Sequence, residues 1–290
     1  MSLDITEELK KRGAQIQNVT STYISCNAYY RGGDNPTALC VFLDNLTCYD
    51  FVTKRKFSLE ELLGMKIDKT KLVTKLGRVH TPTYFKKEDK LLLLPQYDYF
   101  KERGISEDTL KCFENGMCHS GELYQRSSFP IYEWPQYGKP KIIGYHGRKV
   151  DDNRAGAKWK IIGKKQYFVY PAFRSEPYIE QTQSVVLVEG GDFLFLWDAG
   201  VRQVLACLGG NLNPAMIKYM LRFQDLNIYL GFNSDEAGRK SFEKAHKKLS
   251  QFFPNEQLHD AAPAGHGDFG EMTKAQISDW AATCKLTIHK

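Results

Sequence analysis

Acidic and amide side chains follow two apolar, strand-like runs at the points where those runs end. Glu189 follows the run 185–188, and Asn233 and Asp235 follow the run 227–232. In a parallel α/β sheet the carboxyl ends of the strands border the crevice where ligands bind. Clustered carboxylates beside glycines are what a hard divalent cation bound to phosphates requires. The pattern therefore predicts a site for phosphoryl or nucleotidyl transfer.

The same carboxylates have a structural alternative. Asp192 and Asp235 both lie at the starts of predicted helices. A carboxylate at such a position accepts hydrogen bonds from the free backbone N–H groups of the first helical turn. The spacing alone leaves helix capping and cation binding as open alternatives.

The last third of the chain alternates strands with helices. Apolar runs predict strands over 185–188, 204–208, 227–232 and 257–264, and capped or amphipathic segments predict helices over 193–200, 213–223, 235–252 and 273–284. The short connections favour right-handed crossovers and a parallel sheet. We expect an α/β domain over 181–290, after a basic α+β domain over 66–180 and a small β-rich module over 1–65. In that module, we expect a strand near 47–51 and a helix over 58–63.

Composition limits the class of protein. Seven scattered cysteines argue against a disulfide framework and favour a reducing compartment. No apolar run approaches the length of a membrane span, and residues 1–8 lack the basic start and apolar centre of a signal peptide. We therefore expect a cytoplasmic protein without a membrane partner.

Several short motifs occur in a fixed order between residues 95 and 270. They are Tyr99-Phe-Lys-Glu-Arg-Gly-Ile-Ser-Glu-Asp-Thr-Leu, Arg126-Ser-Ser-Phe-Pro-Ile131, Ile143-Gly-Tyr-His-Gly-Arg148, Lys158-Trp159, Glu189-Gly190, and Asn233-x-Asp235 with Ala237-Gly238. Together they resemble the catalytic core of bacterial-type DNA primases, whose last part is a Toprim domain. The Glu-Gly pair alone would be weak evidence, and the specificity comes from the collinear order. The compact form suggests a phage-encoded member.

The resemblance implies a DNA primase that makes short RNA primers on single-stranded DNA from ribonucleoside triphosphates. It implies Mg²⁺ or Mn²⁺ held by Glu189, Asn233, Asp235 and Asp268, with Glu189 and Asp235 as the catalytic residues. A separate replicative helicase would be a partner, in the cytoplasm of a bacterium or of a phage-infected host.

This chain departs from the family pattern at several acidic positions. Asn233 stands where the family usually has aspartate, and Gly270 stands where a second acid is common. One residue is missing after Glu189, so Asp192 matches the next family acid only approximately. These departures predict weaker metal binding and support a rival, a catalytically weakened primase-like protein that binds single-stranded DNA or tethers a helicase. A Toprim nuclease would share the metal site but would not explain the primase-like residues 95–160.

The middle of the chain is strongly basic. Residues 139–165 hold nine lysines and arginines against two aspartates, a charge of about +7 (nine minus two), whereas the whole chain has a net charge of +6. Basic residues interleaved with aromatic rings are typical of single-strand binding, and a solvated hairpin with aromatic residues in the core is the alternative. We favour packing for the aromatic residues and for His146. We favour contact with template or nucleotide for the basic residues Arg126, Arg148, Lys158 and Lys160.

The N-terminal segment is faintly similar to the zinc ribbon of primases. A four-ligand zinc site needs Cys or His in closely spaced pairs. Cys26 and Cys48 supply one member of each pair, but the positions three residues on are Tyr29 and Phe51, which do not bind zinc. Cys40 lies in an apolar run, where a buried thiol is the ordinary expectation. We therefore expect a ribbon-like fold held by packing, without zinc.

Overall fold

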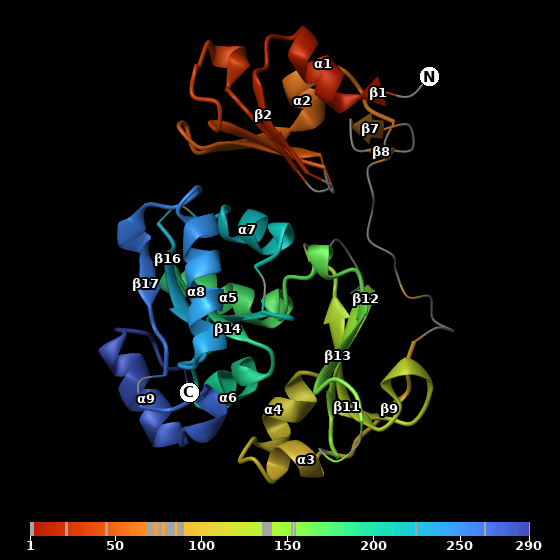
Figure 1. The fold of residues 1–290 in the computed structure, drawn as a ribbon, viewed down its shortest axis with the longest axis vertical. Coiled ribbons are helices and arrows are strands. Elements are labelled where there is room, and N and C mark those ends of the chain that lie inside the picture. The colour runs from red at the N-terminus through yellow and green to blue at the C-terminus, as the bar shows by residue number, and fades with distance from the viewer. Residues whose placement is uncertain are drawn as a thin grey trace. The chain divides into compact units, whose positions relative to one another are not determined.

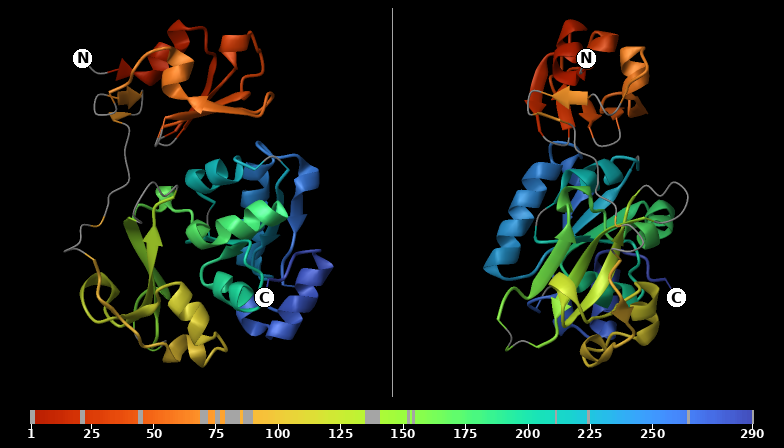
Figure 2. Two further views of the ribbon diagram at one scale, coloured as in Figure 1. Left: turned by 180° about the vertical axis from the view of Figure 1, so that it is seen from behind. Right: turned by 90° about the vertical axis from the view of Figure 1, so that its right-hand side faces the viewer.

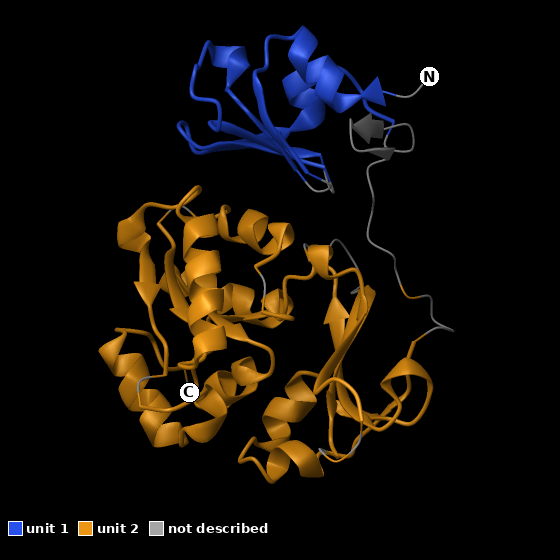
Figure 3. Ribbon diagram, viewed as in Figure 1, with its two compact units in different colours: residues 1–82 blue, residues 83–290 orange. Residues whose placement is uncertain are grey.

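The computed structural model describes residues 3–20, 23–43, 46–68, 72–74, 77–78, 85, 90–134, 141–151, 153, 155–210, 212–223, 225–263 and 265–289. Lys139 and Arg154 of the basic segment lie outside these residues. The chain divides into two compact units, residues 1–82 and residues 83–290 (Figure 3). The boundary between the units therefore falls after residue 82, whereas the sequence placed a module boundary after residue 65.

The first unit is built around an antiparallel sheet. In hydrogen-bonding order its strands are β2 (Ile16–Val19), β3 (Tyr23–Cys26), β4 (Leu39–Phe42), β5 (Thr47–Asp50) and β6 (Arg55–Ser58). Helices α1 (Ile5–Lys11) and α2 (Leu59–Leu63) share one apolar core with this sheet (Figure 1). The expected strand near 47–51 and helix over 58–63 are thus confirmed as β5 and α2.

A small second sheet explains why the first unit extends past residue 65. Strand β7 (Leu72–Thr74) pairs in parallel with β1 (Leu3–Asp4) and antiparallel with β8 (Gly77–Arg78). This pairing joins residues from the two ends of the unit. No pattern local to either segment predicts it.

The second unit begins with an antiparallel sheet. Its strands follow the order β13 (Trp159–Gly163), β12 (Ile142–Lys149), β11 (Arg126–Tyr132), β10 (Gly116–Cys118) and β9 (Leu93–Leu94). Two short helices, α3 (Asp98–Lys101) and α4 (Glu107–Cys112), lie between β9 and β10 in the chain. Ser106 caps α4 by accepting a hydrogen bond from the Thr109 N–H group at 3.3 Å. The expected α+β architecture is confirmed.

A parallel sheet follows in the same unit. Its strands lie in the order β15 (Val204–Cys207), β14 (Ser184–Glu189), β16 (Asn227–Gly231) and β17 (Leu258–Asp260), and all neighbouring pairs are parallel. The helices around it are α5 (Ala172–Thr182), α6 (Asp192–Asp198), α7 (Pro214–Met220), α8 (Glu236–Leu249) and α9 (Lys274–Thr283) (Figures 1 and 2). The predicted alternation of strands and helices is confirmed.

Helix α5 is an element that the sequence analysis did not predict. It contains Pro177 in its interior, and proline there removes a backbone hydrogen bond and disfavours a helix. Ser175 of this helix donates a buried hydrogen bond to the carbonyl oxygen of Val204 at 2.8 Å, so tertiary contacts support the helix. None of the described helices is long and apolar enough to cross a membrane.

The two sheets of the second unit share one hydrophobic core. Phe129 of β11 and Phe113 after α4 belong to the same buried cluster as Phe193 of α6 and Val188 of β14. The ring centroids of Phe113 and Phe193 lie 5.1 Å apart, edge to face. Such aromatic pairs add to the free energy that burial supplies. This shared core holds the antiparallel sheet against the carboxyl ends of the parallel strands.

Candidate active site

A pocket of about 660 Å³ lies where the antiparallel sheet meets the parallel sheet of the second unit. Among the residues that line it are the predicted site residues Glu189, Asn233, Asp268, Arg148 and Lys158. The chain passes from β14 to β15 on one side, and then returns to β16 on the other side of β14. Ligands of open α/β sheets bind at the carboxyl ends of strands at such a switch point. The pocket therefore occupies the expected place.

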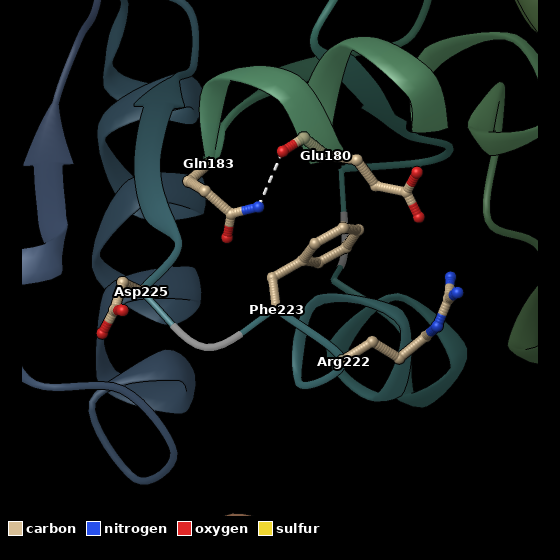
Figure 4. Close-up of a pocket in the computed structure, with 5 residues that line it drawn as sticks. All are labelled: Glu180, Gln183, Arg222, Phe223 and Asp225. Atoms are coloured by element: carbon tan, nitrogen blue, oxygen red, sulfur yellow. Dashed lines mark hydrogen bonds between the residues drawn. The ribbon is translucent and has the colours of Figure 1, made fainter.

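A second pocket, of about 460 Å³, lies at the opposite ends of the same strands (Figure 4). Its lining residues are Glu180, Gln183, Arg222, Phe223 and Asp225, which precede β14 or β16. Gln183 turns its amide to the backbone, donating to the carbonyl oxygen of Glu180 at 2.7 Å. None of the predicted site residues lines this pocket, so the candidate site lies at the carboxyl ends.

The turn after β14 shapes one edge of the larger pocket. Gly190 has a φ of +43°, a backbone conformation that favours glycine. A Cβ atom at Gly191 would lie 2.5 Å from the indole ring of Trp159 at the start of β13. The glycine pair therefore lets the indole lie directly on the turn that follows Glu189. This contact joins the basic sheet to the acidic strand end.

Three buried oxygen atoms in the pocket residues have no hydrogen-bond partner among the described residues. They are Glu189 Oε1, Asp192 Oδ2 and Asn233 Oδ1. An unsatisfied buried oxygen costs about 1–3 kcal/mol, and such groups in a folded protein call for an explanation. A hard cation that accepts oxygen ligands would satisfy all three.

Burial and neighbouring charge disfavour ionisation of the carboxyl groups of Glu189 and Asp192. Burial raises the pKa of Glu189, a hydrogen bond with Ser241 opposes this shift, and the charge of Asp235 adds to it. Burial raises the pKa of Asp192 well above its usual range, the charges of Asp268 and Glu189 add to the shift, and Lys158 opposes it. Carboxyl groups that repel one another in a pocket bind cations favourably, because a cation removes the repulsion.

Two of the acids also cap the segments that follow them. Asp235 Oδ1 accepts from the N–H group of Gly238 at 2.7 Å at the start of α8, and Asp268 Oδ1 accepts from Glu271 N–H at 3.1 Å. Asp192 makes no such bond, since Gly191 is the N-cap of α6 and no side chain caps that helix. Capping thus accounts for Asp235 but not for Asp192.

The acids do not form a ready-made ligand cage. Within the part of the chain that the structure describes, no three His, Cys, Asp or Glu side chains lie together as a metal-ligand group. The oxygen donors still suit Mg²⁺ or Mn²⁺, because Mg²⁺ usually keeps several waters and takes only one or two protein carboxylates. The residues present therefore fit a divalent cation that is partly hydrated or held together with a phosphate ligand.

Strand register places Arg148 at the pocket and Lys160 on the other face of the same sheet, and Lys158 reaches the pocket from the residue before β13. Arg148 of β12 pairs with Trp159 of β13, and both line the pocket, as does Lys158. Lys160 is one residue further along β13, so its side chain points to the other face of the sheet. There Lys160 Nζ forms an ion pair with Glu122 at 3.0 Å. The structure thus brings Arg148 and Lys158 to the site, but not Lys160.

Arg126 is buried and is not among the residues that line the pocket. Its guanidinium donates to the backbone carbonyl oxygens of Gly147 and Lys158 at 3.3 Å each and of Ala157 at 2.9 Å. It therefore supports the β12–β13 connection. Contact of Arg126 or Lys160 with nucleic acid stays a prediction from the family resemblance.

Residues 186–262 match a family model described as Toprim-like. A DNA primase of Borreliella burgdorferi is 26% identical over 206 residues, which are 68% of this chain and 37% of that protein. The Aquifex aeolicus primase, solved with its zinc binding and RNA polymerase domains, gives a TM-score of 0.55 at 18% identity and covers 97% of this chain and 83% of its own. The RNA polymerase domain of Mycobacterium tuberculosis primase DnaG, solved with a double-stranded DNA oligomer that has a 6-nucleotide overhang, gives 0.53 at 20% identity, covering 65% and 72%.

The second unit has the fold of primase catalytic cores and contains a Toprim-like segment over residues 186–262, and we call it the primase-type core. The predicted family resemblance and fold class are therefore confirmed. The chain spans 37% and 33% of the lengths of the first two curated relatives. In this core, Asp192 is one of two acidic pocket residues, with Glu271, that the sequence-based metal set left out. The missing residue after Glu189 obscured its alignment, although its position at a predicted helix start next to the Glu-Gly pair was a usable signal.

The primase-type core places two further residues at the pocket that the sequence analysis did not assign. Tyr99 and Arg103 line it, and the Arg103 guanidinium carbon lies 3.7 Å from the centroid of the Tyr99 ring. Arg148 approaches the same ring at 5.1 Å. The ring of Tyr99 is thus within cation–π distance of both guanidinium groups. Tyr99 begins one of the motifs that carry the primase resemblance, and that position was the available signal.

In the first unit, the predicted ribbon cysteines are buried. Cys26 and Cys48 belong to the apolar core, and burial raises the pKa of Cys26 to about 12. Tyr29 packs against the same core, and burial raises its pKa to about 12. Cys40 is also fully buried, as expected from its apolar run. A zinc-free ribbon stays a prediction.

Proposed function

We propose that this chain is a DNA primase that synthesises short RNA primers on single-stranded DNA by metal-dependent nucleotidyl transfer. The observation that carries the proposal is the pocket in which the unpartnered oxygens of Glu189, Asp192 and Asn233 lie with the cations Arg148 and Lys158. Acidic oxygens suit a divalent cation, and arginine and lysine suit phosphate. Both are needed to bind a metal-loaded nucleoside triphosphate.

The cation would be Mg²⁺ or Mn²⁺, held by Glu189, Asp192 and Asn233, with Asp235 and Asp268 adding negative charge nearby. When bound, it supplies neutralisation of the triphosphate and activation of the attacking 3′-hydroxyl. Glu189 and Asp235 keep the catalytic role that the resemblance implies. Asn233 contributes a neutral carbonyl oxygen, so this site binds its cation with less charge than an aspartate there would give.

The basic residues of the pocket act on the other charged groups. Arg148 is buried, stacks near Tyr99 and donates to the carbonyl oxygen of Lys158 at 3.4 Å, so its guanidinium is held in place. Lys158 is exposed and interacts with the charge of Asp192. We assign Arg148 to orient phosphate groups and Lys158 to follow the phosphate charge as the triphosphate enters.

The template in this proposal is single-stranded DNA, the substrates are ribonucleoside triphosphates, and a separate replicative helicase is the partner. The DNA-bound mycobacterial structure supports the choice of template. We place the activity in bacterial or phage DNA replication in the cytoplasm. The compact arrangement of motifs is the reason to name a phage.

A second function has an observation in its favour. Asn233 replaces a usual family acid, and no three-residue ligand group is present among the described side chains. A primase-like protein with weakened catalysis would bind single-stranded DNA or tether a helicase through the same basic surface. Against it stand Glu189 and Asp192, because buried carboxyls with unpartnered oxygens are costly to keep without a cation.

The test is primer synthesis on mixed single-stranded templates with labelled ribonucleotides and either Mg²⁺ or Mn²⁺. The variant is Glu189→Gln, and Glu256→Gln is the matched control because Glu256 is exposed and lies outside the pocket. Primers made by the wild type and the control, but not by Glu189→Gln, support the primase. Single-strand binding without synthesis in either metal would favour the scaffold function.

A further inference from the structure

His146 lies at the pocket of the primase-type core with an unused hydrogen-bonding group. It lines the pocket, its side chain is 1% exposed, and its Nδ1 atom has no partner among the described residues. Sequence analysis favoured simple packing for this residue. Packing does not explain the nitrogen, because a buried polar atom without a partner is destabilising.

The ring of His146 is held in one plane. It stacks on the indole of Trp159 with ring centroids 4.1 Å apart and an interplanar angle of 18°. Trp159 itself lies on the Gly190–Gly191 turn that follows Glu189. His146 is therefore connected by direct contacts to the acidic strand end, and the stack fixes the plane of its ring.

The imidazole is uncharged at physiological pH. Burial lowers the pKa of His146 to about 3, and the nearby charge of Lys165 acts in the same direction. A neutral imidazole carries one donor and one acceptor nitrogen. It does not supply the positive charge that a phosphate prefers, and Arg148 and Lys158 already supply charge at the pocket.

We propose that His146 is a specificity-determining residue that hydrogen-bonds the ribose 2′-hydroxyl of the nucleotide in this pocket. The inference rests on the proposed function, since it takes a nucleotide as the occupant. A template-directed enzyme accepts all four bases, so a fixed side chain serves every substrate only by contacting a group that all four share. Of the shared groups, phosphate suits the cations, and the hydroxyl both donates and accepts as a neutral imidazole does.

Trp159 has a distinct part in this arrangement. Its ring covers one face of His146 and leaves hydrogen bonding to the ring edge. An enzyme that makes RNA in a cell that also contains deoxyribonucleotides needs such a contact, because only the 2′-hydroxyl differs between the two sugars. His146 thus selects the sugar, while Glu189 and its neighbours bind the charged end of the same nucleotide.

The first arm of the test changes only the ligand. Dissociation constants of the full-length wild type are measured by calorimetry for ATP, 2′-deoxyATP and 3′-deoxyATP with Mg²⁺, and again for GTP and 2′-deoxyGTP. We expect loss of the 2′-hydroxyl to weaken binding roughly three- to tenfold for both bases, which corresponds to one neutral hydrogen bond. Loss of the 3′-hydroxyl should leave the ratio to ATP near one.

The second arm changes the residue. His146→Phe keeps an aromatic ring to stack on Trp159 but removes both nitrogens. It should therefore bind ATP and 2′-deoxyATP equally, each with the affinity that the wild type has for 2′-deoxyATP. His146→Asn places an amide near Nδ1 and should restore part of the preference. The control is His119→Phe, because His119 is exposed and outside the pocket. Near-ultraviolet circular dichroism and melting curves verify that each variant folds.

Three results would overturn the assignment. They are equal binding of the two sugars by the wild type, an unchanged preference in folded His146→Phe, and a preference that depends on the base. These outcomes are separate from failure of the primase proposal, because binding is measured without primer synthesis. Sugar-selective binding without primers would leave the role of His146 in place and reject the primase. Primer synthesis without sugar-selective binding would support the primase and reject the role of His146.

Discussion

Asp198 at the end of α6 and Ser106 at the start of α4 are joined by hydrogen bonds across the second unit. Asp198 Oδ2 accepts from the backbone N–H group of Ser106 at 3.1 Å, and Oδ1 accepts from the Ser106 hydroxyl. Thr109 donates to the same carboxylate at 2.6 Å, and Lys274 Nζ lies 2.6 Å from it. Because α3 and α4 are adjacent in the chain, this carboxylate fixes the helical segment that carries Tyr99 at the pocket.

Asp198→Asn should lower the free energy of unfolding by roughly 1–3 kcal/mol, because an amide accepts at one atom only and leaves buried donors unpaired. Denaturant unfolding of the full chain measures this. Asp279→Asn is the matched control, since Asp279 is exposed on α9. An equal loss in both variants would contradict the anchoring role of Asp198.

Asp192→Asn should stabilise the protein when divalent cations are absent. The pKa of Asp192 is raised in the folded state, so the folded state binds more protons than the unfolded state. The contribution of Asp192 to the free energy of unfolding is then fully present below the ordinary carboxyl pKa, and it is lost as the pH rises through the raised pKa of the folded state. Replacing the carboxyl with an amide removes that cost at neutral pH, which we expect to add on the order of 1–3 kcal/mol.

The same variant should lose the stabilisation that Mg²⁺ or Mn²⁺ gives to the wild type. Melting temperatures at pH 5 to 8, with and without each cation, test both statements. Asp108→Asn is the control, because Asp108 is exposed on the surface of α4. If Asp192→Asn keeps the full cation-induced shift, Asp192 is not a ligand.

Asn233→Asp should tighten binding of divalent cations at the pocket. The substitution adds a negative charge at a buried oxygen that has no hydrogen-bond partner among described residues. We expect roughly a fivefold to fiftyfold lower dissociation constant for Mn²⁺, the range given by one added charge-assisted contact. Calorimetry measures it, with Asn255→Asp at an exposed position as the comparison. Unchanged affinity in Asn233→Asp would place the cation elsewhere.

The first unit should keep its fold in the presence of a metal chelator. Its buried carboxylate Asp50 accepts from Arg31 Nε at 2.6 Å and from the Val52 N–H group at 2.9 Å, and Tyr30 also donates to it. Burial acts to raise the pKa of Asp50, but these hydrogen bonds hold it at about 2. Hydrogen exchange of this unit should be unaffected by EDTA, and bound zinc should be absent by elemental analysis.

Asp50→Asn, in contrast, should destabilise this unit by roughly 1–3 kcal/mol at neutral pH. In the wild type the contribution of Asp50 is present above its unfolded pKa and is lost as pH falls towards about 2. Asp34→Asn, at an exposed position, is the control. In the chelator experiment described above, faster hydrogen exchange of the first unit after EDTA, with zinc released, would show that metal supports the fold of this unit.

The sequence by itself determined the features that depend on neighbouring residues. Alternation of strands and helices in the last third, the cap Asp235, and the acids at the ends of β14 and β16 all follow from local periodicity and side-chain chemistry. The order of several short motifs was enough for the primase resemblance. These signals are local because hydrogen bonds in helices and caps join residues three or four apart.

Only the tertiary structure decided which side chains meet. A shift of one residue along β13 places Trp159 at the pocket and Lys160 on the opposite face, and strand pairing fixes that register. The pairing of β1 with β7 sets the extent of the first unit, and contacts between chain-distant residues support α5 despite Pro177. Burial, which raises the pKa of Asp192 and leaves Nδ1 of His146 without a partner, depends on packing across the whole unit, so no local pattern predicts it.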